Sequence, residues 1–147
     1  MDIIESNLKF KDLSYGNQPE ILVLHHAAIS MCSVEDVHKL HLGNGWAGCG
    51  YHFLVRKDGS IYRGRPEESI GAHCAGANDM SIGICAEGNY MQELMPEKQK
   101  ISTVNLCKYV MKKYNIEMIK CHKELNEGTD CPGINYPFEE IKELTLK

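Results

Sequence analysis

The chain has 147 residues, which is long enough for one α/β domain with its own core and too short for two ordinary domains. Hydrophobic residues make up 43% of the chain and charged residues 24%, a composition typical of a water-soluble globular protein and not of a disordered one. The formal net charge is −4 and the 16 Lys and Arg are spread along the chain, so no nucleic-acid binding through phosphate contacts is expected.

The first clear element is a short apolar run over residues 21–25, rich in branched side chains, which predicts a buried strand ending in His25-His26. Ser33 can cap a helix that ends before Gly43. The apolar side of this helix is expected to include Val34, Val37 and Leu40. His38 and His41 are then expected to face solvent.

A hairpin is predicted next, because residues 52–57 and 60–63 flank Asp58-Gly59, a pair that supplies the positive φ angles of a two-residue turn. Residues 64–80 are predicted to form a loop. Residues 81–86 predict another buried strand, in which Gly83 indicates the close approach of a neighbouring backbone.

Pro96 can open a long helix in its first turn. Apolar residues at helical spacing predict one buried stripe, formed by Ile101, Val104, Cys107, Met111 and Tyr114. A last strand over 116–121 and a closing helix over 138–144 complete the pattern. The sequence therefore predicts an α/β fold, with a central mixed sheet of about five strands flanked by about three helices. A ligand site is expected at the strand ends.

Seven cysteines form an odd count, whereas a secreted disulfide scaffold usually has an even one. Six of them are expected to be reduced thiols that pack as small apolar side chains, namely Cys32, Cys49, Cys74, Cys85, Cys107 and Cys121. Cys131 differs because it precedes Pro132-Gly133 in a polar loop. No apolar stretch approaches the ~18 residues that cross a bilayer, so no membrane insertion is expected.

The candidate chemistry rests on His25, His122 and Cys131. Imidazole and thiolate are ligand types that hold zinc, and three protein ligands leave a fourth position for water, as in hydrolytic sites. Only one residue of the pair His25-His26 can enter a given site, because adjacent strand residues face opposite ways. From these residues alone, a metal site and satisfied structural histidines remain equal alternatives.

The chain resembles the type-2 N-acetylmuramoyl-L-alanine amidases, a fold shared by phage lysozyme-type amidases, bacterial autolysins and animal peptidoglycan recognition proteins. The matching segments occur in the family order over roughly residues 20–140. They are residues 24–28, Gly50-Tyr51-His52-Phe53-Leu54-Val55, Asp58-Gly59, Gly64-Arg65, Gly71-Ala72-His73, Asn78, residues 81–84, Gly88-Asn89, His122 and Cys131-Pro132-Gly133. The resemblance implies that residues 1–147 form a single amidase catalytic domain.

The resemblance implies one Zn²⁺ per chain, held by His25, His122 and Cys131. Tyr51 matches a family tyrosine that sits beside the metal and helps catalysis. Some phage members have a lysine two residues before the ligand cysteine, whereas this chain has Thr129, whose hydroxyl could act as a donor in the transition state.

The implied reaction is hydrolysis of the amide bond between the lactyl group of muramic acid and the L-alanine of the peptidoglycan stem peptide. His73 and Asn78 belong to the loop that lines the substrate cleft in similar proteins, where they contact substrate or stabilise the loop. Trp46 is expected to pack in the core beside the first helix in preference to stacking on a sugar. Glu87 is expected to be a solvated strand-end carboxylate, with a role as base as the alternative.

Three other functions remain open: a peptidoglycan-recognition module without activity, a cysteine hydrolase with Cys131 as nucleophile and His122 as base, and a structural zinc domain. The partner is expected to be bacterial cell-wall peptidoglycan, and the protein is expected to be a monomer. Residues 1–5 lack the basic and apolar regions of a secretory signal. We therefore expect cytoplasmic synthesis and release to the cell wall, as for phage or prophage lysins, or a piece of a longer wall-associated enzyme.

Overall fold

The computed structural model describes all 147 residues, and a mixed sheet of six strands in the order β1-β4-β3-β5-β2-β6 forms its framework. The strands are β1 (Ile3–Ile4), β2 (Ile21–His26), β3 (Phe53–Val55), β4 (Ile61–Arg63), β5 (Ser81–Ala86) and β6 (Met118–Cys121). The helices are α1 (Val34–Gly43), α2 (Glu97–Tyr114), α3 (His122–Leu125) and α4 (Phe138–Leu146). The expected mixed α/β fold is confirmed, with β1 and the four-residue α3 as additions.

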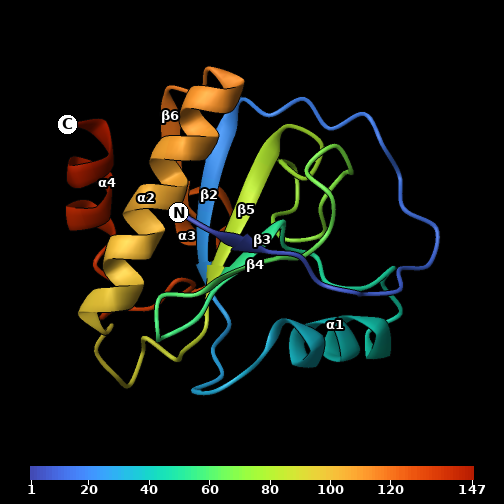
Figure 1. Cartoon of the computed structure of the whole chain (residues 1–147), viewed down its shortest axis with the longest axis horizontal. Helices are drawn as coiled ribbons and strands as arrows, with labels where there is room; N and C mark the ends of the chain where they lie inside the picture. The colour runs from blue at the N-terminus through green and yellow to red at the C-terminus, as the bar shows by residue number, and fades with distance from the viewer.

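The strands β3, β5, β2 and β6 pair with one another in parallel, in that order. At the other side of β3, β4 pairs antiparallel with β3, and β1 pairs parallel with β4. Every residue of β2 and β5 is buried, as expected for parallel strands that are covered on both faces. Figure 1 shows α2 and α4 on one side of the sheet and α1 on the other. No helix is both long and apolar enough to cross a membrane.

Alternate residues of β2 supply two separate cores. Leu22 and Leu24 join a core cluster of 20 buried residues that includes residues of α2 and α4. Val23 lies in a smaller cluster with Cys74 and Ala77 from the loop before β5. Because the side chains of a strand alternate between faces, His25 falls on the side of Val23 and His26 on the side of Leu24.

The β3–β4 connection differs from the predicted two-residue turn. Arg56 and Ser60 pair through the bond from Arg56 N to Ser60 O, which leaves residues 57–59 as a three-residue loop. In this loop only Gly59 has a positive φ, +90°, while the Asp58 carboxylate accepts from Ser60 N at 2.9 Å. Gly59 therefore occupies the one left-handed position of the loop, and the Asp58 carboxylate stabilises the start of the second strand through its bond with Ser60 N.

Helix α1 begins at its predicted cap, where Ser33 and Asp36 form a capping box. Val34 and Val37 are buried as predicted. Leu40 is 50% exposed, whereas His38 and His41 are each 6% exposed, so the predictions for these three residues were wrong. His38 Nδ1 accepts from Cys49 N at 2.9 Å, and His41 Nδ1 accepts from Gly50 N at 2.8 Å. The two imidazoles are buried because they satisfy backbone donors of the segment before β3.

Helix α2 begins one residue after Pro96, which occupies the N-cap position. Val104, Cys107 and Met111 are buried as predicted, whereas Ile101 is 52% exposed and does not belong to the buried stripe. Gln99 takes part in the core instead, with its side-chain amide donating to Val55 O at 2.9 Å and Glu87 O at 2.8 Å. The spacing of hydrophobic residues cannot show whether a polar residue such as Gln99 is buried with its hydrogen bonds formed or exposed to solvent.

Candidate metal centre

The register of the parallel strands brings two histidines together. Leu24 of β2 pairs with Cys121 of β6, so the next residues along the two strands, His25 and His122, leave the sheet edge side by side. Their ring centroids are 4.7 Å apart. His25 is fully buried at the carboxyl end of β2, and His122 starts helix α3. The expectation that the site lies at the strand ends is confirmed.

Cys131 reaches the two histidines from the loop after α3. Its Sγ lies 3.6 Å from Nδ1 of His25 and accepts from the backbone N–H of His26 at 3.4 Å. The bond from Lys123 N to Cys131 O, 2.9 Å, ties this loop back to α3. The peptide bond between Cys131 and Pro132 is cis. One ligand atom from each of His25, His122 and Cys131 then lies within 4.8 Å of the others.

This group of donors fits a zinc ion. Two imidazole nitrogens and one thiolate sulfur are donors that Zn²⁺ prefers. Nitrogen and sulfur ligands about 2.1 and 2.3 Å from a tetrahedral zinc lie about 3.6 Å apart, which agrees with the observed 3.6 Å between His25 Nδ1 and Cys131 Sγ. The group contains three donors, so a tetrahedral ion would keep one position for water or substrate.

Burial dominates the electrostatics of these groups when no cation is present. It lowers the pKa of His25 well below its ordinary value, and the neighbouring His122, His26 and His52 lower it further. Burial also raises the pKa of the Cys131 thiol to about 12, although the backbone N–H of His26 opposes this change. His25 and Cys131 are therefore neutral in the absence of a cation, and binding of a cation must release the thiol proton.

Two of the predicted residues lie behind the donors or in the wall of the cleft. His73 is buried, and its Nδ1 lies 2.9 Å from Nε2 of His25. Asn78 Oδ1 accepts from the backbone N–H groups of His73 and Cys74 at 2.8 and 2.9 Å, so this side chain stabilises the loop. Asn126, which the sequence did not single out, accepts from Nε2 of His122 at 2.8 Å.

A cleft runs across the site in two arms that share Tyr51 and His122. The α1 arm, about 470 Å³, is lined among others by His41, Trp46, His73 and Asn78. The loop arm, about 560 Å³, is lined among others by Asn89, Met91, Gln92, Thr129 and Cys131. The ring of Tyr51 stands 5.0 Å from that of His25, between the two arms.

Trp46 was predicted to pack in the core, but this prediction was wrong. Trp46 is 41% exposed, and its ring lies 4.6 Å from that of His41 at the surface of the α1 arm. In the other arm, Thr129 Oγ1 accepts from Cys131 N at 3.2 Å, so the hydroxyl proton remains available to a ligand. Exposed aromatic and hydroxyl groups beside the donors are suited to contact a sugar or a peptide.

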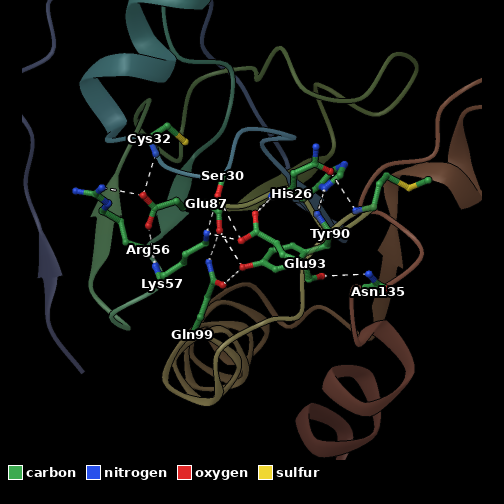
Figure 2. Close-up of polar contacts among 12 residues, drawn as sticks. His26, Ser30, Cys32, Arg56, Lys57, Glu87, Tyr90, Glu93, Gln99 and Asn135 are labelled. Carbon is green, nitrogen blue, oxygen red and sulfur yellow. Dashed lines mark hydrogen bonds and ion pairs between the residues drawn. The ribbon is translucent and has the colours of Figure 1, made fainter.

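Glu87 is 3% exposed and is therefore not the solvated strand-end carboxylate that was expected. Its carboxylate accepts from the Arg56 guanidinium at 2.8 Å and from the backbone N–H groups of Lys57 and Cys32, each at 2.9 Å (Figure 2). Burial opposes its ionisation, but these three bonds outweigh burial and hold the pKa of Glu87 below its usual value. The carboxylate joins the end of β3 to the segment before α1, which is a structural task.

Comparisons with known proteins agree with this arrangement. A family model described as N-acetylmuramoyl-L-alanine amidase matches residues 15–134. The structure of N-acetylmuramoyl-L-alanine amidase LysC from Clostridium intestinale URNW is 43% identical with a TM-score of 0.94, covering 97% of this chain and 96% of that one.

Relatives of a second kind also match. Peptidoglycan-recognition protein SC2 of Drosophila melanogaster is 31% identical over 141 residues, which are 88% of this chain and 76% of that protein. The structure of peptidoglycan recognition protein-LE in complex with tracheal cytotoxin, a monomeric diaminopimelic acid-type peptidoglycan, is 29% identical with a TM-score of 0.84. It covers 96% of this chain and 92% of that one.

Proposed function

Because the chain belongs to the N-acetylmuramoyl-L-alanine amidase family, we propose that it is a zinc-dependent amidase of bacterial peptidoglycan. The bond hydrolysed would be the amide between the lactyl group of muramic acid and the L-alanine of the stem peptide. The observation that carries this proposal is the group of His25, His122 and Cys131, three zinc-type donors within 4.8 Å of one another beside a two-armed cleft.

Each side chain near the donors has a separate task in this reaction. His25, His122 and Cys131 would hold the ion. A zinc ion bound there would supply an acidified water and a Lewis acid for an unactivated amide. Tyr51 lines both arms, and we assign to its phenol the donation of a hydrogen bond to the substrate carbonyl oxygen as negative charge grows on it. The Thr129 hydroxyl, whose proton is available, can be a second donor.

The two arms of the cleft support a substrate that extends to both sides of the reacting bond. A bond at the junction of sugar and peptide needs room on both sides of the reacting atoms, and the two arms meet at Tyr51 and His122. His73 and Asn78 contribute to the wall of the α1 arm. The complex of protein-LE with a peptidoglycan fragment supports peptidoglycan as the ligand of this fold.

The direct experiment is digestion of purified cell walls followed by mass spectrometry. The proposal requires release of intact stem peptides with a free N-terminal alanine and of glycan strands with unsubstituted lactyl groups. Treatment with a chelator should abolish the release, and added Zn²⁺ should restore it. Cleavage at another bond, or undiminished cleavage in metal-free protein, would contradict the proposal.

A recognition module without activity is the second candidate, because peptidoglycan-recognition proteins are among the relatives. That function predicts sedimentation of the protein with cell walls and no soluble products. The cysteine hydrolase receives less support, since the imidazole at 3.6 Å from Cys131 Sγ is that of His25, while His122 Nε2 is bonded to Asn126. A purely structural zinc domain would leave the two arms without a ligand.

A further inference from the structure

Two chains of hydrogen bonds run from the imidazoles of the candidate metal centre to the loop of residues 73–78. One begins at His25 and passes through His73 and Ser81. The other begins at His122 and passes through Asn126. Each ends on a main-chain carbonyl of the loop, Ala77 O in the first case and Ala75 O in the second.

Counting protons shows which atom donates in each hydrogen bond of the first chain, from Ser81 back to His25. Ser81 Oγ lies 2.6 Å from Ala77 O, and because a carbonyl only accepts, the single hydroxyl proton of Ser81 must lie in that contact. The contact of 3.1 Å between Ser81 Oγ and His73 Nε2 therefore needs its proton from the imidazole. His73 is thus a donor at Nε2.

The same counting fixes the tautomer of His25. His73 is buried without a carboxylate partner, so it is neutral, and with its proton on Nε2 it offers a lone pair at Nδ1. His25 Nε2, 2.9 Å away, must donate to that lone pair. A neutral His25 then has no proton on Nδ1, which is the nitrogen 3.6 Å from Cys131 Sγ.

The second chain gives the same result for His122. Asn126 Nδ2 donates to Ala75 O at 2.9 Å, which assigns the orientation of the amide and makes Oδ1 its acceptor. His122 Nε2, 2.8 Å from that Oδ1, must donate. In the neutral imidazole of His122, Nδ1 is then left with the lone pair.

Packing holds the His73 ring in the orientation that the first chain needs. A Cβ atom at Gly83 would lie 2.7 Å from the imidazole, and one at Gly71 would lie 2.6 Å from it. Gly83 was predicted to allow a backbone approach, but the group that approaches is this side chain. No larger residue fits at either position unless the ring moves.

We propose that Ser81, His73 and Asn126 are positioning residues, through which the carbonyl groups of the loop 73–78 set both metal-facing imidazoles in the tautomer with a bare Nδ1. A metal ion binds the lone pair of a neutral imidazole, so this tautomer is the one prepared for binding. The inference rests on the metal part of the proposed function.

The first test is the tautomeric state of the metal-free protein at pH 8, read from ¹⁵N chemical shifts of labelled histidine. His25, His73 and His122 should all carry the proton on Nε2. In Ser81→Ala, His73 loses its acceptor, and both His73 and His25 should shift toward a mixture of tautomers while His122 does not change. A proton on Nδ1 of His25 in the unaltered protein would overturn the proposal.

The second test is the affinity for Zn²⁺, measured by competition with a chromophoric chelator. Ser81→Ala should weaken binding by roughly 2- to 10-fold, because the affinity falls with the fraction of His25 that keeps a bare Nδ1 in the mixture of tautomers. Ser69→Ala is the matched control, since it deletes an equally buried hydroxyl bonded to a loop carbonyl, Pro66 O, outside the two chains. It should bind zinc as tightly as the unaltered protein.

Asn126 provides an independent pair of variants. Asn126→Leu removes the acceptor of His122 and should weaken zinc binding, whereas Asn126→Asp keeps an oxygen acceptor and should restore much of the affinity. Folded Ser81→Ala and Asn126→Leu proteins with unchanged zinc affinity would overturn the inference and leave the proposed amidase intact. If the unaltered protein bound no zinc, the metal proposal would fail, and the tautomers would still be measured.

Discussion

Cys131 Sγ lies 3.6 Å from His25 Nδ1, although 106 positions separate the two residues in the chain. The contact links the end of β2 to a loop that is anchored on α3 by Lys123 N. Because β2 and β6 are neighbours in parallel register, His122 falls beside the same point. Two distant parts of the chain, the end of β2 and residues 122–131, therefore meet when the central sheet is formed, so the candidate metal centre depends on the fold.

Substitution of a donor should remove zinc and activity together. Cys131→Ser or His25→Ala leaves two donors, and we expect zinc affinity to fall by more than about 100-fold, beyond the effect of removing a group behind the ligands. Hydrolysis of cell walls at low concentrations of free Zn²⁺ should be lost together with zinc binding. Zinc content and product release are measured on the same preparations.

The matched control is Cys107→Ser, which changes a fully buried thiol of α2 that belongs to the large core cluster and not to the group of donors. It should lower the free energy of unfolding, because a hydroxyl replaces an apolar thiol, and leave zinc binding intact. If Cys131→Ser still bound one zinc ion per chain with unchanged affinity, the ion would be held elsewhere.

Tyr51→Phe should separate binding from catalysis. The ring keeps its contacts with His25 and His41, so the fold and the zinc site should persist, while the donor to the substrate oxygen is lost. Loss of one such donor typically lowers kcat by about 10²- to 10³-fold. The measurements are kcat on soluble muropeptides and zinc affinity, and an unchanged kcat would remove the hydroxyl from the reaction.

The strands over residues 21–25 and 81–86 could be predicted because they are short, apolar and buried on both faces. Strand β1 could not, since two residues carry no periodicity. The candidate donors could be recognised through the resemblance to a family, whereas their residue types alone left two readings open. Asn126 had no signal, because its role depends on the position of His122 Nε2 and Ala75 O in space.

The predictions for Leu40 and His41 of α1 were wrong because, as for Asn126, the role of the residue depends on a distant part of the chain. Hydrophobic spacing placed Leu40 inside and His41 outside, yet the backbone donor of Gly50 needs an acceptor, and His41 supplies it. Trp46 then covers His41 from the cleft side. A pattern of apolar residues cannot record the backbone groups of another segment that a helix must satisfy.

Glu87→Gln should reduce stability and spare the reaction. The carboxylate side chain is 4% exposed and its charge is matched by Arg56 and two backbone N–H groups, so a neutral amide would leave Arg56 poorly paired. We expect a loss of about 1–3 kcal/mol in the free energy of unfolding. Urea unfolding measures this loss, and wall hydrolysis per folded molecule should not change.

Glu93→Gln is the control for that substitution. Glu93 pairs with Lys57 in the same region, but both side chains are about one quarter exposed, so the expected loss is at most about 1 kcal/mol. A Glu87→Gln protein that is stable and zinc-loaded but slow would instead place the carboxylate in the reaction.

The metal-free protein should lose stability as the pH falls from 6.5 toward 4, and His52 should account for part of the loss. Burial lowers the pKa of His52 to about 4, against the opposing effect of Ser69 O, and Arg65 lowers it further, while Glu67 and Glu68 favour the cation. Because the folded-state pKa lies below the unfolded value of about 6.5, the unfolded chain takes up the proton first. The stabilisation is complete above pH 6.5 and is lost on acidification.

For this residue the expected loss between pH 7.5 and pH 5 is about 2 kcal/mol. His52→Gln removes the titrating group, and its amide can replace part of the bonds to Gly83 N and Ser69 O. The variant should be less stable at pH 7.5 but show a smaller difference between the two pH values in urea unfolding. Burial also lowers the pKa of His41, to about 4, so some pH dependence should remain. An identical pH dependence in His52→Gln and the unaltered protein would mean that His52 gains its proton equally in both states, contrary to its burial.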